Sequence, residues 1–382
     1  MKKIVVFLIG LVLGVGMGLG VLFVLPSISR ADNLVLPAPL QTKTVIGFLP
    51  YWLLATAKKD YSDSITTLTY FGLRIDSDGS IQKLTDPQEE EPGWYALTSG
   101  KLTPFFRSAH AHGVALSLLV SSGDDYSIAA LIDQPVSHAG KFVSAIEPVL
   151  KKYRFSDLNI DIEYTGDASA SSRKKFTQFM QAVRKNLDPK YTLTIEVTGD
   201  DLIKSKLIDP AAMGNLADNV VVMAYDYHYL GSFVTGPVAP LGGAGKIAEY
   251  DVTTAMKKAV HSIPPEKVIL GTPLYGYEWE TIGTAPRSAI IPGTGLTASN
   301  RRAEQFVNAC ASCSAQFDTT DQEVHVVYRD SGTGTYHQLF YPDAQATAAK
   351  INLANQLDLG GLALWALGYE GPTIINPLKN YR

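Results

Sequence analysis

The recurrence of short apolar runs along the chain is the feature that most constrains its fold. From Thr44 onward, runs rich in Val, Ile, Leu and Thr alternate with amphipathic segments of helix length. Eight such runs occur, at residues 44–50, 67–73, 114–120, 158–163, 192–197, 219–225, 267–274 and 360–367. Strands that alternate with helices indicate a parallel sheet, and eight of them favour a closed barrel over an open sheet. We therefore predict an α/β fold, a (β/α)8 TIM barrel over residues 44–382.

One interval between consecutive runs is much longer than the others. The chain between the seventh and eighth runs contains further strand-like pieces, "EVHVVYRD" at 323–330 and "YHQLFYP" at 336–342. Short strands grouped in this way do not continue the alternation of one strand with one helix. The sequence therefore predicts a small α+β insertion at about residues 278–355, between barrel strands seven and eight.

The fourth run carries acidic side chains in a regular alternation. Polar residues occupy its odd positions and aliphatic residues its even positions: Asp157, Asn159, Asp161 and Glu163 against Leu158, Ile160 and Ile162. Successive side chains of a strand point to opposite faces, so all the polar groups share one face. Carboxylates inside a buried parallel sheet are costly unless they are paired or used. One interpretation is that these acidic side chains form a functional site inside the sheet. The other is that the segment is an amphipathic strand with its polar face in solvent.

The ends of the predicted strands gather acidic and aromatic residues. The active sites of (β/α)8 barrels lie at the carboxyl ends of the strands, which meet at one mouth. Flat aromatic faces beside carboxylates suit a sugar ring, although aromatic residues also fill barrel cores. The residues expected at this mouth, including three of the four tryptophans, are Tyr51, Trp52, Asp161, Glu163, Met223, Tyr225, Asp226, Tyr275, Trp279 and Trp365.

These residues resemble the motifs of glycoside hydrolase family 18, the chitinase-like barrels. The family's strand-four signature, Asp-x-x-Asp-x-Asp-x-Glu, falls on Ser156, Asn159, Asp161 and Glu163, of which the last two match. Its strand-six Met-x-Tyr-Asp matches Met223, Tyr225 and Asp226, "GPVAPL" at 236–241 resembles the following loop, and Trp365 matches the eighth-strand tryptophan. The resemblance extends from about Thr44 to the C-terminus. The block at 336–372 is similar to a bacterial branch with spore-cortex-lytic and peptidoglycan-acting members, which commonly carries Asn at the position of Asn159.

The resemblance implies a substrate-assisted, retaining hydrolysis of β-1,4 bonds in polymers that contain N-acetylglucosamine. Glu163 would protonate the leaving oxygen while the substrate's acetamide attacks the anomeric carbon. Asp161 would orient the acetamide, Tyr225 would hydrogen-bond its carbonyl, and Trp365 would form the floor under the sugar. Asn159 would hydrogen-bond Asp161, and Asp161 would raise the pKa of Glu163 by like-charge repulsion. The remaining substrate-binding candidates are Asn159, Asp226, Tyr51, Trp52, Met223 and Tyr275.

Three alternative functions remain open at this point. A catalytically weak or inactive carbohydrate-binding barrel would be a different functional class, and such relatives typically lose the position of Glu163. An endo-β-N-acetylglucosaminidase acting on N-glycans would share the motif and the mechanism. A Mg²⁺-dependent barrel enzyme could use Asp161, Glu163 and Asp226, but the strand ends lack the His or Lys expected as its base.

The composition of the chain limits the kinds of molecule that it is expected to bind. The net charge of −4 gives no basic footprint for nucleic acid. His110 and His112 are two residues apart in a predicted helix, so they face different ways and do not suggest a metal site. We therefore expect no cofactor, no metal and no nucleic acid, and a monomeric protein that binds polysaccharide.

The N-terminus predicts export. Residues 4–26 are uncharged and apolar, long enough to cross a bilayer, and they follow Lys2 and Lys3, which should stay in the cytoplasm. Ser29–Ala31 would serve as a small-residue cleavage site. Residues 1–31 are thus either a signal peptide or a membrane anchor, residues 32–43 a linker, and the remainder an extracytoplasmic domain, secreted or anchored.

Export also affects how the two cysteines are interpreted. Cys310 and Cys313 have CxxC spacing, with no second pair that would form a zinc site. In an oxidising compartment a local disulfide between them is the favoured interpretation, and two free thiols are the alternative.

Overall fold

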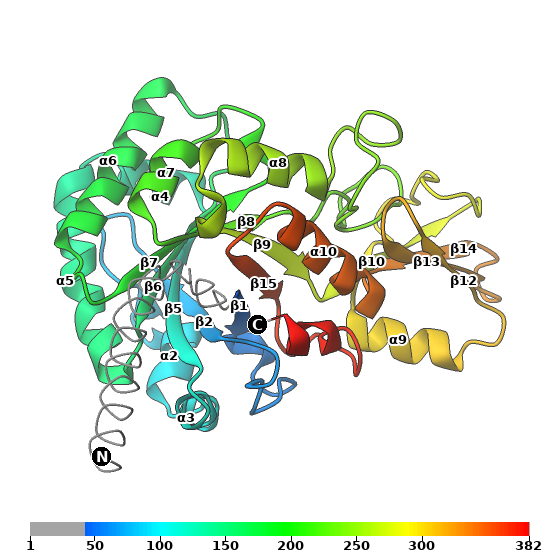
Figure 1. The fold of residues 1–382 in the computed structure, drawn as a ribbon, viewed down its shortest axis with the longest axis horizontal. Helices are drawn as coiled ribbons and strands as arrows, with labels where there is room; N and C mark the ends of the chain where they lie inside the picture. Colours follow the sequence, from blue (N-terminus) through cyan, green and yellow to red (C-terminus); the bar gives the residue numbers. More distant parts are fainter. Residues whose placement is uncertain (1–42, 382) are drawn as a thin grey trace, which may run out of the picture. The chain divides into compact units, whose positions relative to one another are not determined.

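Each of the eight apolar runs forms a strand of one closed barrel in the computed structural model, which describes residues 43–381 (Figure 1). The strands lie in the cyclic order β1-β15-β9-β8-β7-β6-β5-β2, and neighbouring strands are parallel. The predicted (β/α)8 barrel is confirmed. The barrel strands are β1 (Thr44–Pro50), β2 (Thr67–Arg74), β5 (Ala115–Ser122), β6 (Asp157–Ile162), β7 (Thr192–Thr198), β8 (Asn219–Met223), β9 (Val268–Pro273) and β15 (Gly361–Trp365).

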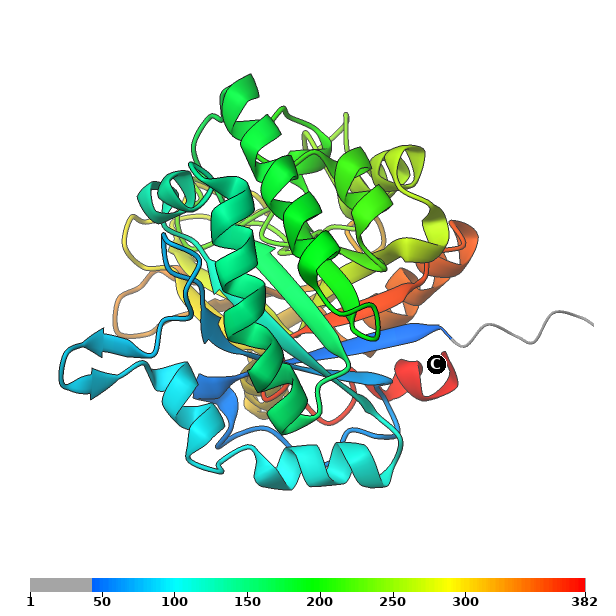
Figure 2. The same cartoon turned by 90° about the vertical axis from the view of Figure 1, so that its left-hand side faces the viewer.

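Helices separate all consecutive barrel strands except β1 and β2, which only a 3-10 turn separates, and they surround the barrel (Figures 1 and 2). Several begin at Ser or Asp side chains that accept a hydrogen bond from a first-turn amide, among them Asp124, Ser169 and Asp343. The helices are α2 (Pro92–Thr98), α3 (Thr103–Ala111), α4 (Asp125–Leu131), α5 (Pro135–Tyr153), α6 (Ala170–Asn186), α7 (Pro210–Leu216), α8 (Val252–Ser262) and α10 (Ala344–Gln356), with short 3-10 turns η1 (Tyr51–Leu53), η2 (Asp200–Leu202), η3 (Pro265–Lys267) and η4 (Asn376–Asn380). A small hairpin, β3 (Leu84–Asp86) and β4 (Glu89–Glu90), projects from the barrel, at the left in Figure 2.

Strand β6 is buried along its whole length. Its even residues, such as Leu158 and Ile160, belong to the large core between the barrel and its helices. Its odd residues therefore face the barrel interior, where a separate small apolar cluster includes Phe48 and Leu119. The interpretation of this strand as a solvated amphipathic strand is wrong.

A second sheet follows the seventh barrel strand and lies beside the barrel (Figure 1). It is antiparallel and five-stranded, in the order β11-β10-β14-β13-β12. Its elements are β10 (Tyr275–Thr281), β11 (Leu296–Ser299), β12 (Ser314–Asp318), β13 (Glu323–Arg329), β14 (Tyr336–Tyr341) and the helix α9 (Asn300–Ala309). Residues of α9 and the sheet, among them Ala303 and Val326, form a small core of their own.

The bounds of this sheet differ from the predicted insertion at 278–355. The sheet begins at Tyr275, directly after β9, because Pro273 ends the barrel strand and the Leu274 amide turns to donate to the Trp365 carbonyl. The sheet ends at Tyr341, and α10, which lay within the predicted range, packs on barrel strands β9 and β15.

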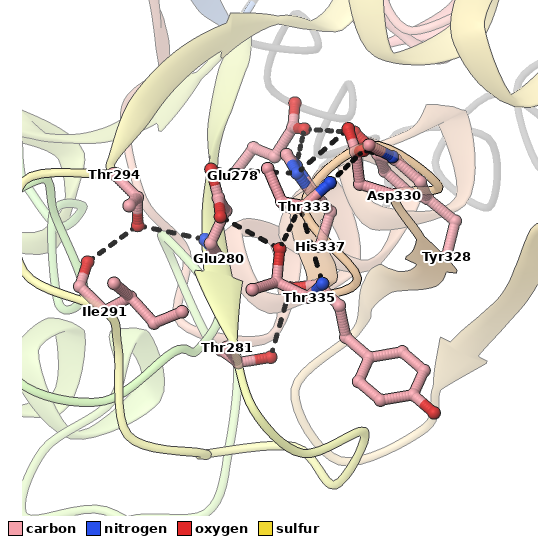
Figure 3. A network of polar contacts seen from close by, with 12 residues as sticks. Glu278, Glu280, Thr281, Ile291, Thr294, Tyr328, Asp330, Thr333, Thr335 and His337 are labelled. Carbon is pink, nitrogen blue, oxygen red and sulfur yellow. Dashed lines mark hydrogen bonds and ion pairs between the residues drawn. The ribbon is translucent and has the colours of Figure 1, made fainter.

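A polar network ties the inserted elements together (Figure 3). Glu278 of β10 is buried, and its carboxylate accepts hydrogen bonds from the Tyr328 hydroxyl and, at 2.8 Å, from Nη2 of Arg302. Nδ1 of His337 lies 2.7 Å from the same carboxylate. These contacts join β10, β13, β14 and α9, so the buried charge is paired, as burial requires.

Two further predictions concern the ends of the chain and its cysteines. The structure joins Cys310, at the end of α9, to Cys313 in a disulfide. The predicted signal peptide or anchor and the linker up to residue 42 lie outside the described residues. Within residues 43–381, no helix has both the length and the apolar character that a membrane span needs.

Candidate active site

Asp161 and Glu163 stand at the carboxyl end of β6, as the alternation predicted. Asp161 is buried on the inward row, and its Oδ1 atom has no hydrogen-bond partner. Glu163 follows the last strand residue; its amide donates to the Ser122 carbonyl at 2.9 Å, and its side chain lies among the groups that line the barrel mouth. Burial raises the pKa of Asp161 well above its usual range, and the charge of Glu163 raises it further. Burial and the neighbouring charge therefore both favour the neutral form of the Asp161 carboxyl group.

The pKa of Glu163 is raised, as expected for a general acid, but for reasons that differ from those predicted. Burial is the largest cause, followed by the charges of Asp226 and Asp201. Asp201 lies in η2, just after β7, and Asp226 just after β8, so both come from neighbouring strands. The repulsion between Asp161 and Glu163 raises the pKa of Asp161 instead.

Asn159 contacts a residue that the sequence analysis did not single out. Its Nδ2 donates to Oε1 of Glu196 at 2.8 Å, and no hydrogen bond joins it to Asp161, contrary to the prediction. Residues two apart on a strand are separated by roughly 6.6 Å along it, whereas adjacent strands lie only about 4.8 Å apart. Glu196 sits between Ile195 and Val197 in β7, and this same alternation was the signal that could have identified it.

Asp226 is held by two tyrosines from the inserted sheet. Its Oδ1 accepts hydrogen bonds from the hydroxyls of Tyr275 at 2.6 Å and Tyr277 at 2.9 Å. Burial raises the pKa of Asp226, and these two bonds lower it. Tyr275 is itself buried, so its contact is with Asp226 rather than with the open mouth. Tyr277 was expected at the end of the seventh strand but not among the binding residues, and it is the course of β10 after the barrel strand that brings its hydroxyl to Asp226.

Aromatic rings line one side of the site. The ring of Trp365 lies 5.0 Å from that of Phe71, 5.8 Å from Phe48 and 6.3 Å from Trp52, measured between centroids. Tyr51 packs edge-on against Trp52 at 4.9 Å. Phe48 and Phe71 were not predicted, since they lie within strands β1 and β2 rather than at their ends.

Trp279 does not reach the mouth, contrary to expectation. It is fully buried in the inserted sheet, where its ring lies 5.7 Å from Tyr277 and 6.3 Å from Phe340. The prediction treated residues 275–279 as the end of the seventh barrel strand. They belong instead to β10, which has already left the barrel.

The predicted catalytic residues share one cavity. Asp161, Glu163, Tyr225, Met223, Asp226, Trp365 and the unpredicted Glu196 line a cavity of about 220 Å³. Burial raises the pKa of Tyr225 well above its usual range, so its hydroxyl keeps its proton as a donor. Residues 43–381 contain no group of three His, Cys, Asp or Glu side chains arranged to hold a metal ion.

The cavity opens on both sides of Glu163. One side, of about 430 Å³, is lined by Tyr51, Trp52 and Arg74. The other, of about 470 Å³, is lined by Lys206, Tyr227 and Tyr250. Glu163 borders all three spaces, so it stands within a groove rather than at the end of a pocket.

The chain is similar to known bacterial and insect proteins. It is 23% identical over 330 residues to a cortical fragment-lytic enzyme of Bacillus anthracis, an alignment that covers 84% of this chain and 68% of the relative. The crystal structure of the Bacillus cereus spore cortex-lytic enzyme SleL has a TM-score of 0.70, covering 90% of this chain and 76% of that one at 20% identity. The structure of an Ostrinia furnacalis Group IV chitinase in complex with allosamidin has a TM-score of 0.76, covering 89% and 97% at 20% identity.

The sequence also matches a model of a protein family, and the matched segment covers most of the chain and every residue of this site. Residues 43–370 match "Glycosyl hydrolases family 18", from the first barrel strand to just beyond Trp365. The chain belongs to glycosyl hydrolases family 18.

Proposed function

We propose that this chain is a glycosidase that hydrolyses β-1,4 bonds of polymers containing N-acetylglucosamine, by substrate-assisted, retaining catalysis. The observation that carries the proposal is the single cavity that Asp161, Glu163, Tyr225 and Trp365 line together. Such a cavity offers a proton donor, a carboxylate, a hydroxyl donor and a flat apolar wall to one sugar ring.

Each group has a role that its surroundings support. Glu163, whose pKa is raised by burial and by the charges of Asp226 and Asp201, donates its proton to the glycosidic oxygen as the bond to the anomeric carbon breaks. The acetamide oxygen of the substrate attacks that carbon and forms a cyclic cation. The Asp161 carboxylate stabilises this cation, and the Tyr225 hydroxyl orients the acetamide. Water then opens the ring, with Glu163 accepting its proton, and the two inversions at one carbon give retention.

The groove on both sides of Glu163 supports cleavage within a polymer. A polymer chain lying along it would place sugars on the Trp52 side and on the Tyr227 side of the bond being cleaved. Trp52 is 47% exposed, so its indole is available for the face of a sugar.

Peptidoglycan is the polymer we favour, with chitin as the second. Two of the similar proteins reported above carry cortex-lytic names, and peptidoglycan is a polymer that meets a protein outside the cytoplasm. We propose that residues 1–31 export the domain, which is then secreted or anchored, and that it acts as a monomer. An N-glycan substrate and an inactive binding barrel are the competing proposals, and the presence of Glu163 speaks against the second.

Product analysis of the full chain tests the proposal. The chain is incubated with chitin oligomers, purified peptidoglycan and an N-glycan, and the products are identified by mass spectrometry, with Glu163→Gln as the matched control. Products that end in N-acetylglucosamine, absent from the control, are expected from peptidoglycan. Products from the N-glycan alone would move the assignment to that substrate. Binding without products would favour the inactive barrel.

A further inference from the structure

Glu196 is the buried carboxyl in this cavity to which the mechanism assigns no role. We infer that Glu196 is a positioning residue that shares one proton with Asp161 and thereby keeps the Asp161 carboxylate ionised while the cyclic cation forms. The inference rests on the proposed function for its chemical consequence. Its structural part, the sharing of a proton, can be measured without any substrate.

The barrel register places the two carboxyls side by side. On β6 and β7, Asn159 pairs with Thr194 and Ile160 pairs with Ile195, so the next inward positions are Asp161 and Glu196. Both side chains are buried and both line the same cavity. They therefore occupy adjacent places in one layer of the barrel interior, about one strand spacing of 4.8 Å apart.

Around Glu196 there are more buried hydrogen-bond acceptors than donors. Asn159 Nδ2 donates to Glu196 Oε1, while Asn159 Oδ1 and Asp161 Oδ1 are buried without a partner. An ionised Glu196 can only accept hydrogen bonds, so it would add another acceptor without a donor. A protonated Glu196 has one O–H donor on Oε2, which a small rotation can direct to Asp161. When the pair holds a single proton, that proton lies on Glu196, and Asp161 accepts the hydrogen bond as a carboxylate.

The charges around Glu196 also favour its neutral form. The ionisable groups that face it are Asp157, Asp161 and Glu163 from the β6 segment and Tyr225 from the β8 side. The described residues that line the cavity include no Lys, Arg or His. Burial raises the pKa of Glu196 well above its usual range, the charge of Asp161 raises it further, and the Asn159 amide lowers it. Two adjacent buried carboxyls without a cation cannot both ionise near neutral pH.

This arrangement explains the departure at Asn159. The strand-four signature has an acid at that position, and here the acid lies one strand to the side, reached through the Asn159 amide. The carboxyl lost from β6 is thus supplied by β7.

Titration of Asp161 in the absence of substrate tests the shared proton. The full chain in detergent is labelled with ¹³C at aspartate side-chain carboxyls, and the Asp161 signal is assigned by its loss in Asp161→Asn. In the wild type the signal should titrate in two steps, because the pair behaves as a unit. In Glu196→Gln the step at the higher pH, which reports the ionisation of Glu196, should be lost, while the coupling of Asp161 to Glu163 remains. Superimposable titrations of the two proteins would overturn the inference.

Variants of similar volume separate a proton-holding role from simple packing. Glu196→Gln keeps an N–H donor, so kcat should fall by less than about tenfold, and the acid limb of its pH profile should move to higher pH, because an amide N–H stabilises the Asp161 carboxylate less than a carboxyl O–H does. Glu196→Met keeps the volume without a donor, so kcat should fall by roughly 10²-fold with KM nearly unchanged. Equal losses in the two variants would contradict the inference. Asn159→Asp combined with Glu196→Gln should restore the two-step titration.

A control variant, together with separate measurements of the Asp161 titration and of turnover, distinguishes the inference about Glu196 from the proposed function. Glu266→Gln, an exposed residue in η3 at the opposite end of β9, should match the wild type in titration and turnover. A coupled Asp161 titration in a protein that cleaves no N-acetylglucosamine polymer would sink the proposed function and leave the inference standing. Turnover with an Asp161 titration unaffected by Glu196→Gln would sink only the inference.

Discussion

Tyr275 donates a hydrogen bond from its hydroxyl to Oδ1 of Asp226 at 2.6 Å, which joins the inserted sheet to the barrel at the active site. Tyr277, on the same face of β10, donates to the same oxygen at 2.9 Å. Asp226 has a positive φ of 60°, a conformation that costs free energy for a residue other than glycine. The insertion is therefore part of the site, because it holds this carboxylate in place.

Removal of these tyrosine hydroxyls should raise the pKa of Asp226. Both bonds lower that pKa, so in Tyr275→Phe and Tyr277→Phe the acid limb of the pH profile of kcat/KM should move to higher pH. The double variant should shift it furthest. Tyr153→Phe, at the end of α5, is the matched control. An unchanged acid limb in the double variant would show that Asp226 does not control this part of the profile.

Replacement of the general acid should abolish most of the turnover. Glu163→Gln keeps the size of the side chain but has no proton to donate, so kcat should fall by roughly 10²–10⁴-fold. Substrate affinity, measured by calorimetry, should stay nearly the same because Trp365 and Tyr225 are unaffected. Undiminished hydrolysis would remove Glu163 from this role.

The acetamide of the substrate should be required for cleavage. Because the nucleophile is the substrate's own carbonyl oxygen, a deacetylated polymer should not be hydrolysed, and a thiazoline mimic of the cyclic cation should inhibit. Proton NMR of the first product should show retained anomeric configuration. Equal hydrolysis of acetylated and deacetylated polymers is the result that the mechanism cannot accommodate.

The buried carboxyl group of Glu323 should make the free energy of unfolding depend on pH. It is buried, and its oxygens accept the amides of Val238 at 3.0 Å and Ala239 at 2.8 Å. Burial raises its pKa from 4.5 to about 7, with the nearby Lys350 lowering it. Because the folded pKa is the higher one, its contribution is fully present below about pH 4.5 and is lost as pH rises through about 7.

Thermal unfolding of Glu323→Gln checks this contribution. The variant should be less stable than the wild type at pH 5, because the glutamine amide presents one acceptor to two backbone donors. The free-energy gap should narrow by up to about 3 kcal/mol between pH 5 and 8, since only the wild type loses stability by ionising. Glu266→Gln, exposed in η3, is the control. A constant gap would mean that Glu323 does not titrate in this range.

The disulfide should contribute little to stability. Cys310 and Cys313 close a loop with a sequence separation of 3, so the loss of chain entropy on unfolding is small. We expect Cys310→Ser with Cys313→Ser to lower the free energy of unfolding by about 2 kcal/mol or less and to leave hydrolysis nearly intact. Thiol titration of the unreduced, unfolded chain provides the direct check, since two free thiols would rule out the bond.

Local patterns were enough to predict the barrel and half of the site. The eight apolar runs and the two-residue alternation of β6 depend only on neighbours along the chain, so they predicted the strands and the inward face that carries Asp161 and Glu163. Positions at strand ends likewise predicted Tyr225, Asp226 and Trp365, because the carboxyl ends of parallel strands must meet at one mouth.

Only the tertiary structure decided which side chains meet across strands. The packing of β6 against β7 lets the Asn159 amide donate to Glu196 rather than to Asp161, and the early departure of β10 buries Trp279 and brings Tyr277 to Asp226. These contacts depend on how far one strand is shifted against the next and on where a strand leaves the barrel. A shift of a single residue would reverse the facing of every side chain, and no local period in the sequence encodes it.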